Sequence, residues 1–318
     1  IAPLLWPEMT EPHDTVMPFE VRPLGVRGRI VKLGAVIDDI VRAHDYPAAV
    51  SALLAEAVAL AAMLGAIMKF DGKFILQTKT DGPVDLIVAD FASPNGVRGY
   101  ARFNRDRLAA LSKPTQQDML GKGYLAMTVD QGSDMERYQG IVPLDNSTLA
   151  DAADAYFRQS EQIPTRLRLV SGPLLARGEK TTHWRAGAIM VQHLPSEGGI
   201  SPIPFSSGDA PAGAEEEVRE DDNWVRAKIL LDTVEDHELL DPTLTPEDLL
   251  YRLYHEDGVT VYPASSLMRH CTCSAESVES MLRNFSESDR NDMIENGEIK
   301  VICEFCSSEY RFKPGSLA

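Results

Sequence analysis

The four cysteines of this 318-residue chain all lie after residue 270, in two tight pairs. Cys271 and Cys273 form a C-x-C pair, and Cys303 and Cys306 form a C-x-x-C pair. Four thiolates match the tetrahedral preference of zinc, and a hairpin-like segment between the pairs would return the second pair to the first. We therefore predict one zinc ion bound by these four cysteines, with two reduced pairs or two structural disulfides as the alternatives.

The region that carries the cysteines is small. A segment of about 50 residues buries too little surface to fold securely alone, so its fold should depend on the metal. His270 stands beside Cys271 and could replace a thiolate, but four sulfurs already complete a closed site. We expect His270 to be a cationic neighbour that favours the thiolate form, or a solvated side chain.

Each cysteine pair is close enough in sequence to form its own disulfide, Cys271 with Cys273 and Cys303 with Cys306. Disulfide formation would remove the metal ligands, and the small C-x-C ring would be strained and easily reduced again. The spacing therefore allows a redox switch, but spacing alone does not distinguish a switch from a plain structural zinc site, which is the commoner case.

Composition bounds the class of protein. The chain is 44% hydrophobic and 25% charged, with a formal net charge of -17 and a pI near 4.8. The negative charge opposes attraction to phosphate backbones and anionic membranes, so we expect neither nucleic acid nor a membrane as partner. The clustered cysteines favour a reducing compartment, and residues 1–12 show no export signal, so we expect a cytoplasmic protein.

The pattern along the chain predicts an α+β fold. The apolar stretch from Pro47 to Met68 contains Glu56 and much alanine, so we predict a buried helix with Asp45 as N-cap and Pro47 in its first turn, not a bilayer span. Two strand hairpins are predicted, one from 74–78 and 84–91 and the other from 124–130 and 137–142. A helix is predicted at 145–158, and further strands or short helices at 166–169 and 188–194.

A Pro-, Gly- and Ser-rich stretch, 195–217, is the best linker candidate, and an acidic block overlaps its end. Amphipathic helices are predicted at about 223–234 and 245–258, and both are short enough to need a packing partner. We expect an N-terminal β-sheet domain with packed helices at 1–200, a helical linker at 201–262 and a small zinc-binding domain at 263–318.

No other motif predicts catalysis. The dinucleotide-like run 121–126 is followed by a strand pattern where a helix would be needed. His44, His183 and His193 are scattered and more typical of core or surface positions. Arginines 27, 29, 98, 102, 105 and 107 should pair with nearby acids rather than bind RNA. We therefore do not expect an enzyme.

The chain resembles the heat-shock protein 33 family of redox-regulated chaperones, the 33 kDa chaperonins, over nearly its whole length. The cysteine motif carries most of this resemblance. Supporting stretches occur in the same order at 26–29, 81–83, 97–102, 138–142, 160–165 and 185–187.

The resemblance implies an ATP-independent holdase that is inactive when reduced and zinc-bound. Oxidation would release zinc, form the two disulfides and unfold the C-terminal module, so that the linker helices lose their packing partner and unfolding client proteins are bound. It also implies a homodimer when oxidised, transfer of clients to ATP-dependent foldases, and no catalytic residue.

Two other classes compete with this interpretation. A nucleic-acid-binding zinc finger is disfavoured because acidic residues outnumber basic ones between the cysteine pairs. A zinc enzyme is disfavoured because catalytic zinc keeps an open coordination position, which four thiolates do not leave.

Overall fold

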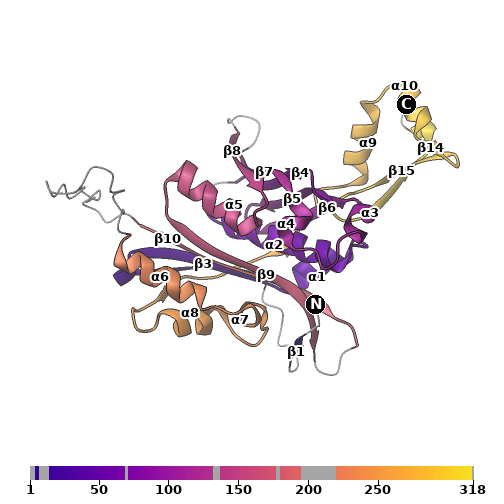
Figure 1. The fold of residues 1–318 in the computed structure, drawn as a ribbon. Helices are drawn as coiled ribbons and strands as arrows, with labels where there is room; N and C mark the ends of the chain where they lie inside the picture. The colour runs from indigo at the N-terminus through magenta and orange to yellow at the C-terminus, as the bar shows by residue number, and fades with distance from the viewer. Residues whose placement is uncertain are drawn as a thin grey trace, which may run out of the picture.

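A computed structural model of the chain describes residues 4–6, 14–68, 71–131, 137–176, 180–194 and 220–316. Two large sheets enclose a central helix, three helices cover the outer face of one sheet, and a small cysteine-bearing module projects from the opposite end (Figure 1). The α+β class, the helical linker region and the C-terminal cysteine cluster are thus confirmed. The predicted linker stretch 195–217 lies outside the described residues.

Sheet A has seven strands in the order β1-β9-β10-β3-β2-β11, with β12 also paired to β2. Strand β1 is parallel to β9, and the other pairings are antiparallel. Its strands are β1 (Leu4–Trp6), β2 (Thr15–Val21), β3 (Val26–Leu33), β9 (Thr165–Ala176), β10 (His183–His193), β11 (Thr260–Val261) and β12 (Ser265–Ser266).

Sheet B has six strands in the order β13-β6-β5-β4-β7-β8. The two predicted hairpins are confirmed as β4–β5 and β7–β8, and they are neighbours through the β4–β7 pairing. Its strands are β4 (Lys73–Thr80), β5 (Val84–Ala92), β6 (Gly96–Phe103), β7 (Lys122–Asp130), β8 (Tyr138–Asp145) and β13 (Met268–Arg269). Strand β7 follows Gly121 directly, so the 121–126 run does not open a helix.

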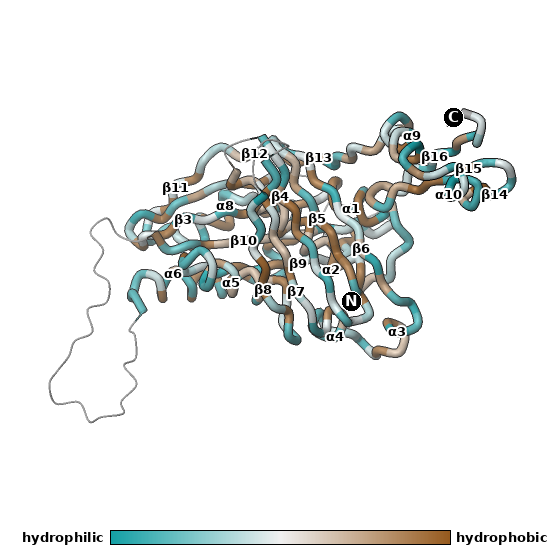
Figure 2. The backbone as a smooth tube through the Cα atoms, turned by 90° about the horizontal axis from the view of Figure 1, so that it is seen from above, coloured by the Kyte–Doolittle hydropathy of each residue, from teal (hydrophilic) through white to brown (hydrophobic). Residues whose placement is uncertain are grey.

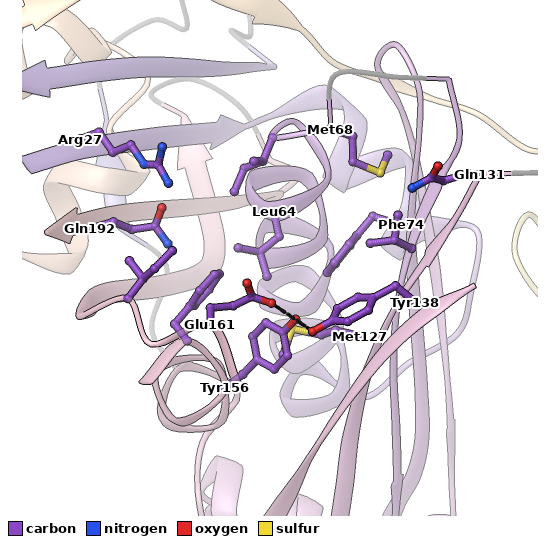
Figure 3. Close-up of a pocket in the computed structure, with 14 residues that line it drawn as sticks. Arg27, Leu64, Met68, Phe74, Met127, Gln131, Tyr138, Tyr156, Glu161 and Gln192 are labelled. Carbon is purple, nitrogen blue, oxygen red and sulfur yellow. Dashed lines mark hydrogen bonds between the residues drawn. The ribbon is translucent and has the colours of Figure 1, made fainter. Parts of the chain in front are cut away.

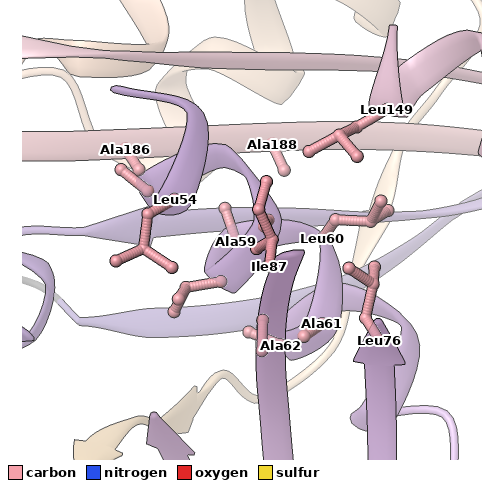
Figure 4. Close-up of a cluster of buried hydrophobic side chains, with 14 of the residues drawn as sticks. Leu54, Ala59, Leu60, Ala61, Ala62, Leu76, Ile87, Leu149, Ala186 and Ala188 are labelled. Carbon is pink, nitrogen blue, oxygen red and sulfur yellow. The ribbon is translucent and has the colours of Figure 1, made fainter. Parts of the chain in front are cut away.

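Helix α2 (Ala48–Gly65) lies between the two sheets and is buried over most of its circumference, as predicted. It is long and apolar enough to cross a bilayer, but 78% of it is buried inside the protein. Figure 4 shows its leucines and alanines against Ile87 of sheet B and Ala188 of sheet A. The predicted N-cap was wrong: Pro47 occupies that position, because its extended ψ of 147° delays the first helical residue to Ala48.

The remaining elements of the two-sheet body are short. Thr115 and Thr148 cap α4 and α5 through capping boxes with Asp118 and Asp151. The helices are α1 (Ala35–Arg42), α3 (Arg105–Ala109), α4 (Gln116–Leu120) and α5 (Leu149–Tyr156), with a 3-10 turn at Arg22–Leu24 and a π turn at Phe157–Glu161.

Three helices, α6 (Asp222–Asp232), α7 (Asp236–Leu240) and α8 (Pro246–Tyr254), cover the outer face of sheet A. Their buried side chains share an apolar core with β2, β3 and β10 that includes Trp224, Leu231, Leu250 and Tyr254. The expectation that the C-terminal module is the packing partner of these helices was therefore wrong. They bury their apolar faces on sheet A, and α7 was not predicted at all.

The C-terminal module contains α9 (Ala275–Arg283), α10 (Glu287–Asp292), a 3-10 turn at Pro314–Ser316 and a three-stranded sheet of β14 (Ile294–Glu295), β15 (Glu298–Ile302) and β16 (Glu309–Phe312). Among its described residues, the buried apolar cluster consists of Leu282 and Ile299, with partly buried neighbours. Figures 1 and 2 both show this module at the end of the molecule opposite α6 and α8. Such a small core agrees with a fold that depends on its cysteines.

Candidate metal centre

The four cysteine side chains converge on one point. The Sγ atom of Cys273 lies 3.3 Å from the Sγ atoms of both Cys271 and Cys306, and those of Cys271 and Cys303 are 3.7 Å apart. All four sulfurs lie within 4.8 Å of one another, and none forms a disulfide. Four sulfurs about 2.3 Å from a shared tetrahedral centre would have similar spacing, so the geometry is compatible with a bound metal ion.

Two short segments position these sulfurs. Cys303 and Cys306 occupy the tip of the β15–β16 hairpin, where Ser307 adopts a left-handed φ of 59° and its N–H donates to the Cys303 carbonyl. Cys271 and Cys273 lie between β13 and α9, whose N-cap is Ser274. The second pair therefore lies at a hairpin tip, while the segment between the two pairs, predicted to be hairpin-like, consists mainly of α9 and α10 before it reaches β14 and β15.

The surroundings of the sulfurs shift their pKa values in opposite directions. Burial, opposed by a hydrogen bond from Tyr310 and reinforced by neighbouring thiols, raises the pKa of Cys273 to about 12. At Cys306, burial is outweighed by hydrogen bonds with Ser308, which lower the pKa to about 6. Four ionised sulfurs packed this closely would repel one another, and a bound divalent cation would offset that repulsion. The donor set thus fits a thiophilic metal.

The cysteine hairpin is docked on sheet B through Phe305. The guanidinium of Arg98 lies 3.9 Å from the centre of the Phe305 ring, and the Tyr100 ring meets it edge-on at 4.8 Å. Arg98 also forms a largely buried ion pair with Asp90 at 2.6 Å and donates to the Thr272 hydroxyl at 3.3 Å. Arg98 therefore contacts both cysteine-bearing segments and ties them to β5 and β6.

Sequence reasoning missed this docking surface. His44, expected at an ordinary core or surface position, lies 3.3 Å from the Ser307 hydroxyl and stacks on Tyr46. Burial lowers the pKa of His44. The aromatic and basic residues of β6 occur in a strand pattern with no marker for docking, so only the fold could bring them to Phe305.

The other candidate residues are not part of the cysteine cluster, either because they lie elsewhere in the fold or because their side chains lie against other residues. His270 is exposed and is not part of the cysteine group; its side chain lies against Gly96 of β6. His183 pairs with Asp38, and His193 stacks on Trp224. Three of the six arginines, 98, 102 and 105, form ion pairs with aspartates, and Arg107 donates to backbone carbonyls.

A cavity of about 530 Å³ opens between the two sheets near the end of α2 (Figure 3). Its lining is mainly apolar, and the hydroxyls of Tyr138 and Tyr156 donate to Glu161 at one side. This hydrogen bonding raises the burial-elevated pKa of Tyr156 still further. Among the residues that the structure describes, the lining includes no cysteine, serine or histidine.

Comparison with known proteins decides the family. The family model described as Hsp33 protein matches residues 14–313. The chain belongs to the Hsp33 family. Its relatives include a 33 kDa chaperonin of Caulobacter vibrioides, 41% identical over 95% of both chains, and one of Sodalis glossinidius, 36% identical over 92% of this chain and 90% of the relative.

A solved Hsp33 structure shares the fold. The crystal structure of the 33 kDa chaperonin from Thermotoga maritima matches with a TM-score of 0.73 at 21% identity, covering 96% of this chain and 97% of that one. The Hsp33 family is a chaperone family, and chaperones of this kind bind unfolded proteins.

Proposed function

We propose that this chain is a redox-regulated, ATP-independent holdase chaperone, inactive when Cys271, Cys273, Cys303 and Cys306 bind one zinc ion. The observation that carries the proposal is the convergence of two cysteine pairs in a module whose own apolar core is only two residues. The bound zinc would supply the cross-link that the module lacks. No residue acts as a catalyst in this proposal.

In this proposal, oxidation of the four sulfurs converts the inactive form into the active form. A peroxide or hypochlorous oxidant converts Cys271 with Cys273, and Cys303 with Cys306, into disulfides. Each new S–S bond releases two electrons, and one peroxide molecule accepts them and becomes two water molecules. The sulfurs can then no longer hold the metal, so the module loses its cross-link and unfolds.

Unfolding of the module then reaches the rest of the chain. Phe305 leaves Arg98 and Tyr100, and the segment before Cys271 loses its anchored end. Apolar surface around the linker helices becomes accessible and binds unfolding client proteins. We further propose an oxidised homodimer, transfer of clients to ATP-dependent foldases, a cytoplasmic location, and the division into 1–200, 201–262 and 263–318.

The test measures metal and activity in one sample. Zinc release is followed with a chromogenic chelator during hydrogen peroxide treatment at mild heat, together with the light scattering of an unfolding client. We expect zinc release and suppression of scattering to occur together and to reverse with a thiol reductant. Zinc release with unchanged scattering would reduce the site to a structural cross-link and refute the proposal.

A further inference from the structure

The segment from Thr260 to His270, here called the edge strap, covers the open edges of both large sheets. Its strands β11 and β12 pair antiparallel with β2, the edge of sheet A. Its strand β13 pairs parallel with β6, the edge of sheet B. One chain segment therefore satisfies backbone groups along two sheet edges.

Backbone hydrogen bonds dominate the attachment of the edge strap. Its N–H groups donate to the carbonyls of residues 14, 18, 95 and 97. Most of its side chains are exposed, and Leu267 is the buried one, at 5%. A segment held mainly through its main chain can be replaced by another extended chain of different sequence.

The edge of β2 is suited to such an exchange. Pro18 accepts a hydrogen bond from the Tyr262 N–H, so the even-numbered residues of β2 direct their carbonyls towards the edge strap, and Val16 and Glu20 also direct their N–H groups there. Pro18 has no N–H and offers its carbonyl alone. On the linker side of the same strand, Met17 and Phe19 belong to the apolar core shared with α6–α8. Both side chains are buried beneath the linker helices, so an added strand would gain backbone partners at this edge and not an apolar surface.

The edge strap is joined directly to the cysteine centre. His270 donates its N–H to the Val97 carbonyl at 2.9 Å, and the next residue is Cys271. Unfolding of the cysteine module would therefore free the end of the strap paired with β6, and detachment could spread from there towards β2. Exposed sheet edges template pairing with other chains, which gives a reason for keeping them covered in the resting protein.

We propose that the edges of β2 and β6, once the edge strap detaches, bind unfolding clients by strand addition. The partner is an extended, unfolded polypeptide segment, recognised through its main chain with little dependence on sequence. This inference rests on the proposed function, because the edge strap detaches when oxidation unfolds the cysteine module. It assigns a client site to the two-sheet body in addition to apolar linker surface.

Hydrogen exchange at single amides tests the proposal directly. In the full-length protein, the N–H groups of Val16 and Glu20 are followed in the reduced, oxidised and client-loaded oxidised states. We expect protection to fall by roughly 100-fold on oxidation and to recover at least about tenfold when an unfolded client is added. Edge amides that stay protected on oxidation, or that stay exposed with client bound, would overturn it.

A matched pair of variants tests the backbone contact itself. Glu20→Pro removes an outward N–H at an edge position, whereas Glu20→Ala removes only the carboxylate that Tyr262 and Arg22 contact. Oxidised Glu20→Pro should bind client about fivefold more weakly than oxidised Glu20→Ala, the effect of one hydrogen bond. Circular dichroism checks that both fold.

The outcomes separate the two proposals. If oxidised wild-type protein does not suppress aggregation, the chaperone switch itself fails. If it suppresses aggregation but Glu20→Pro and Glu20→Ala bind client equally, strand addition at β2 is wrong and the switch survives.

Discussion

The linker helices and the cysteine module are stabilised in different ways. Helices α6–α8 share a large apolar core with sheet A, whereas the module of α9, α10 and β14–β16 has two buried apolar side chains. Hydrophobic burial can therefore hold the helices in place without a metal, while in the proposed mechanism ligation by the cysteines holds the module. An oxidant that acts on sulfur should unfold the second region directly and reach the first only indirectly.

Loss of one sulfur should have the largest effect. Cys303→Ser replaces a thiolate with a hydroxyl that is a poor zinc ligand, and metal binding in such small modules contributes on the order of 10 kcal/mol to folding. We expect metal content to fall and hydrogen-exchange protection in the module to collapse, while α6–α8 stay protected. Ser280→Ala, at an exposed position of α9, is the control and should leave the module intact.

The docking of the linker helices on sheet A should be sensitive to substitution of Lys32. Its ammonium, 2% exposed, donates to the carbonyls of Glu238, Asp241 and Leu244 at 3.0, 2.9 and 2.5 Å. Lys32→Met leaves three buried carbonyls without their donor and should weaken docking of the linker helices by about 3 kcal/mol. The measurement is hydrogen exchange across residues 222–254.

The control for Lys32 is Arg168→Gln, which removes an exposed ion pair with Asp236 on the same helix α7. An exposed pair of this kind contributes about 0.5 kcal/mol or less. Equal effects of the two substitutions would show that the buried ammonium has no special role. Metal content should be unchanged in both, which distinguishes this defect from that of Cys303→Ser.

Docking of the cysteine module on sheet B is expected to be of intermediate strength. Phe305→Ala removes the ring between Arg98 and Tyr100 and should weaken attachment of the module by about 1–2 kcal/mol without releasing metal. Faster metal loss under peroxide is the readout. The control is Phe285→Ala, at a 40% exposed ring in the same module, which should leave the rate of metal loss unchanged. Metal loss accelerated equally in both variants would refute the docking role of Phe305.

The smallest effect concerns pH. Burial, partly offset by Arg166, raises the pKa of Asp154 from 3.8 to about 7. The folded protein thus binds this proton more tightly than the unfolded chain, so stability falls as pH rises from about 4 to about 7 and is level above that.

Asp154→Asn should remove this slope and raise the free energy of unfolding at pH 7.5, because the neutral amide carries no charge to bury. Denaturant unfolding at pH 5 and pH 7.5 measures it. An unchanged slope in the variant would mean that another group titrates in this range.

The comparison also explains what the sequence could reveal. The cysteine spacing, the hairpins at β4–β5 and β7–β8, and the buried helix α2 follow from local patterns and were predicted. The packing of α6–α8 on sheet A, the three bonds of Lys32 and the contact of Phe305 with Arg98 join residues far apart in the chain. Nothing local to Lys32 or His44 signals such a partner, so these contacts appear only with the fold.

Hydrogen exchange during peroxide treatment tests most directly the claim that cysteine ligation holds the module and apolar packing holds the linker. At constant moderate temperature, with zinc followed in the same sample, peptides from 271–312 should lose protection together with metal release. Peptides from 222–254 should lose protection later, or only on warming. Simultaneous loss in both regions, or a module that stays protected after its metal is released, would contradict the account.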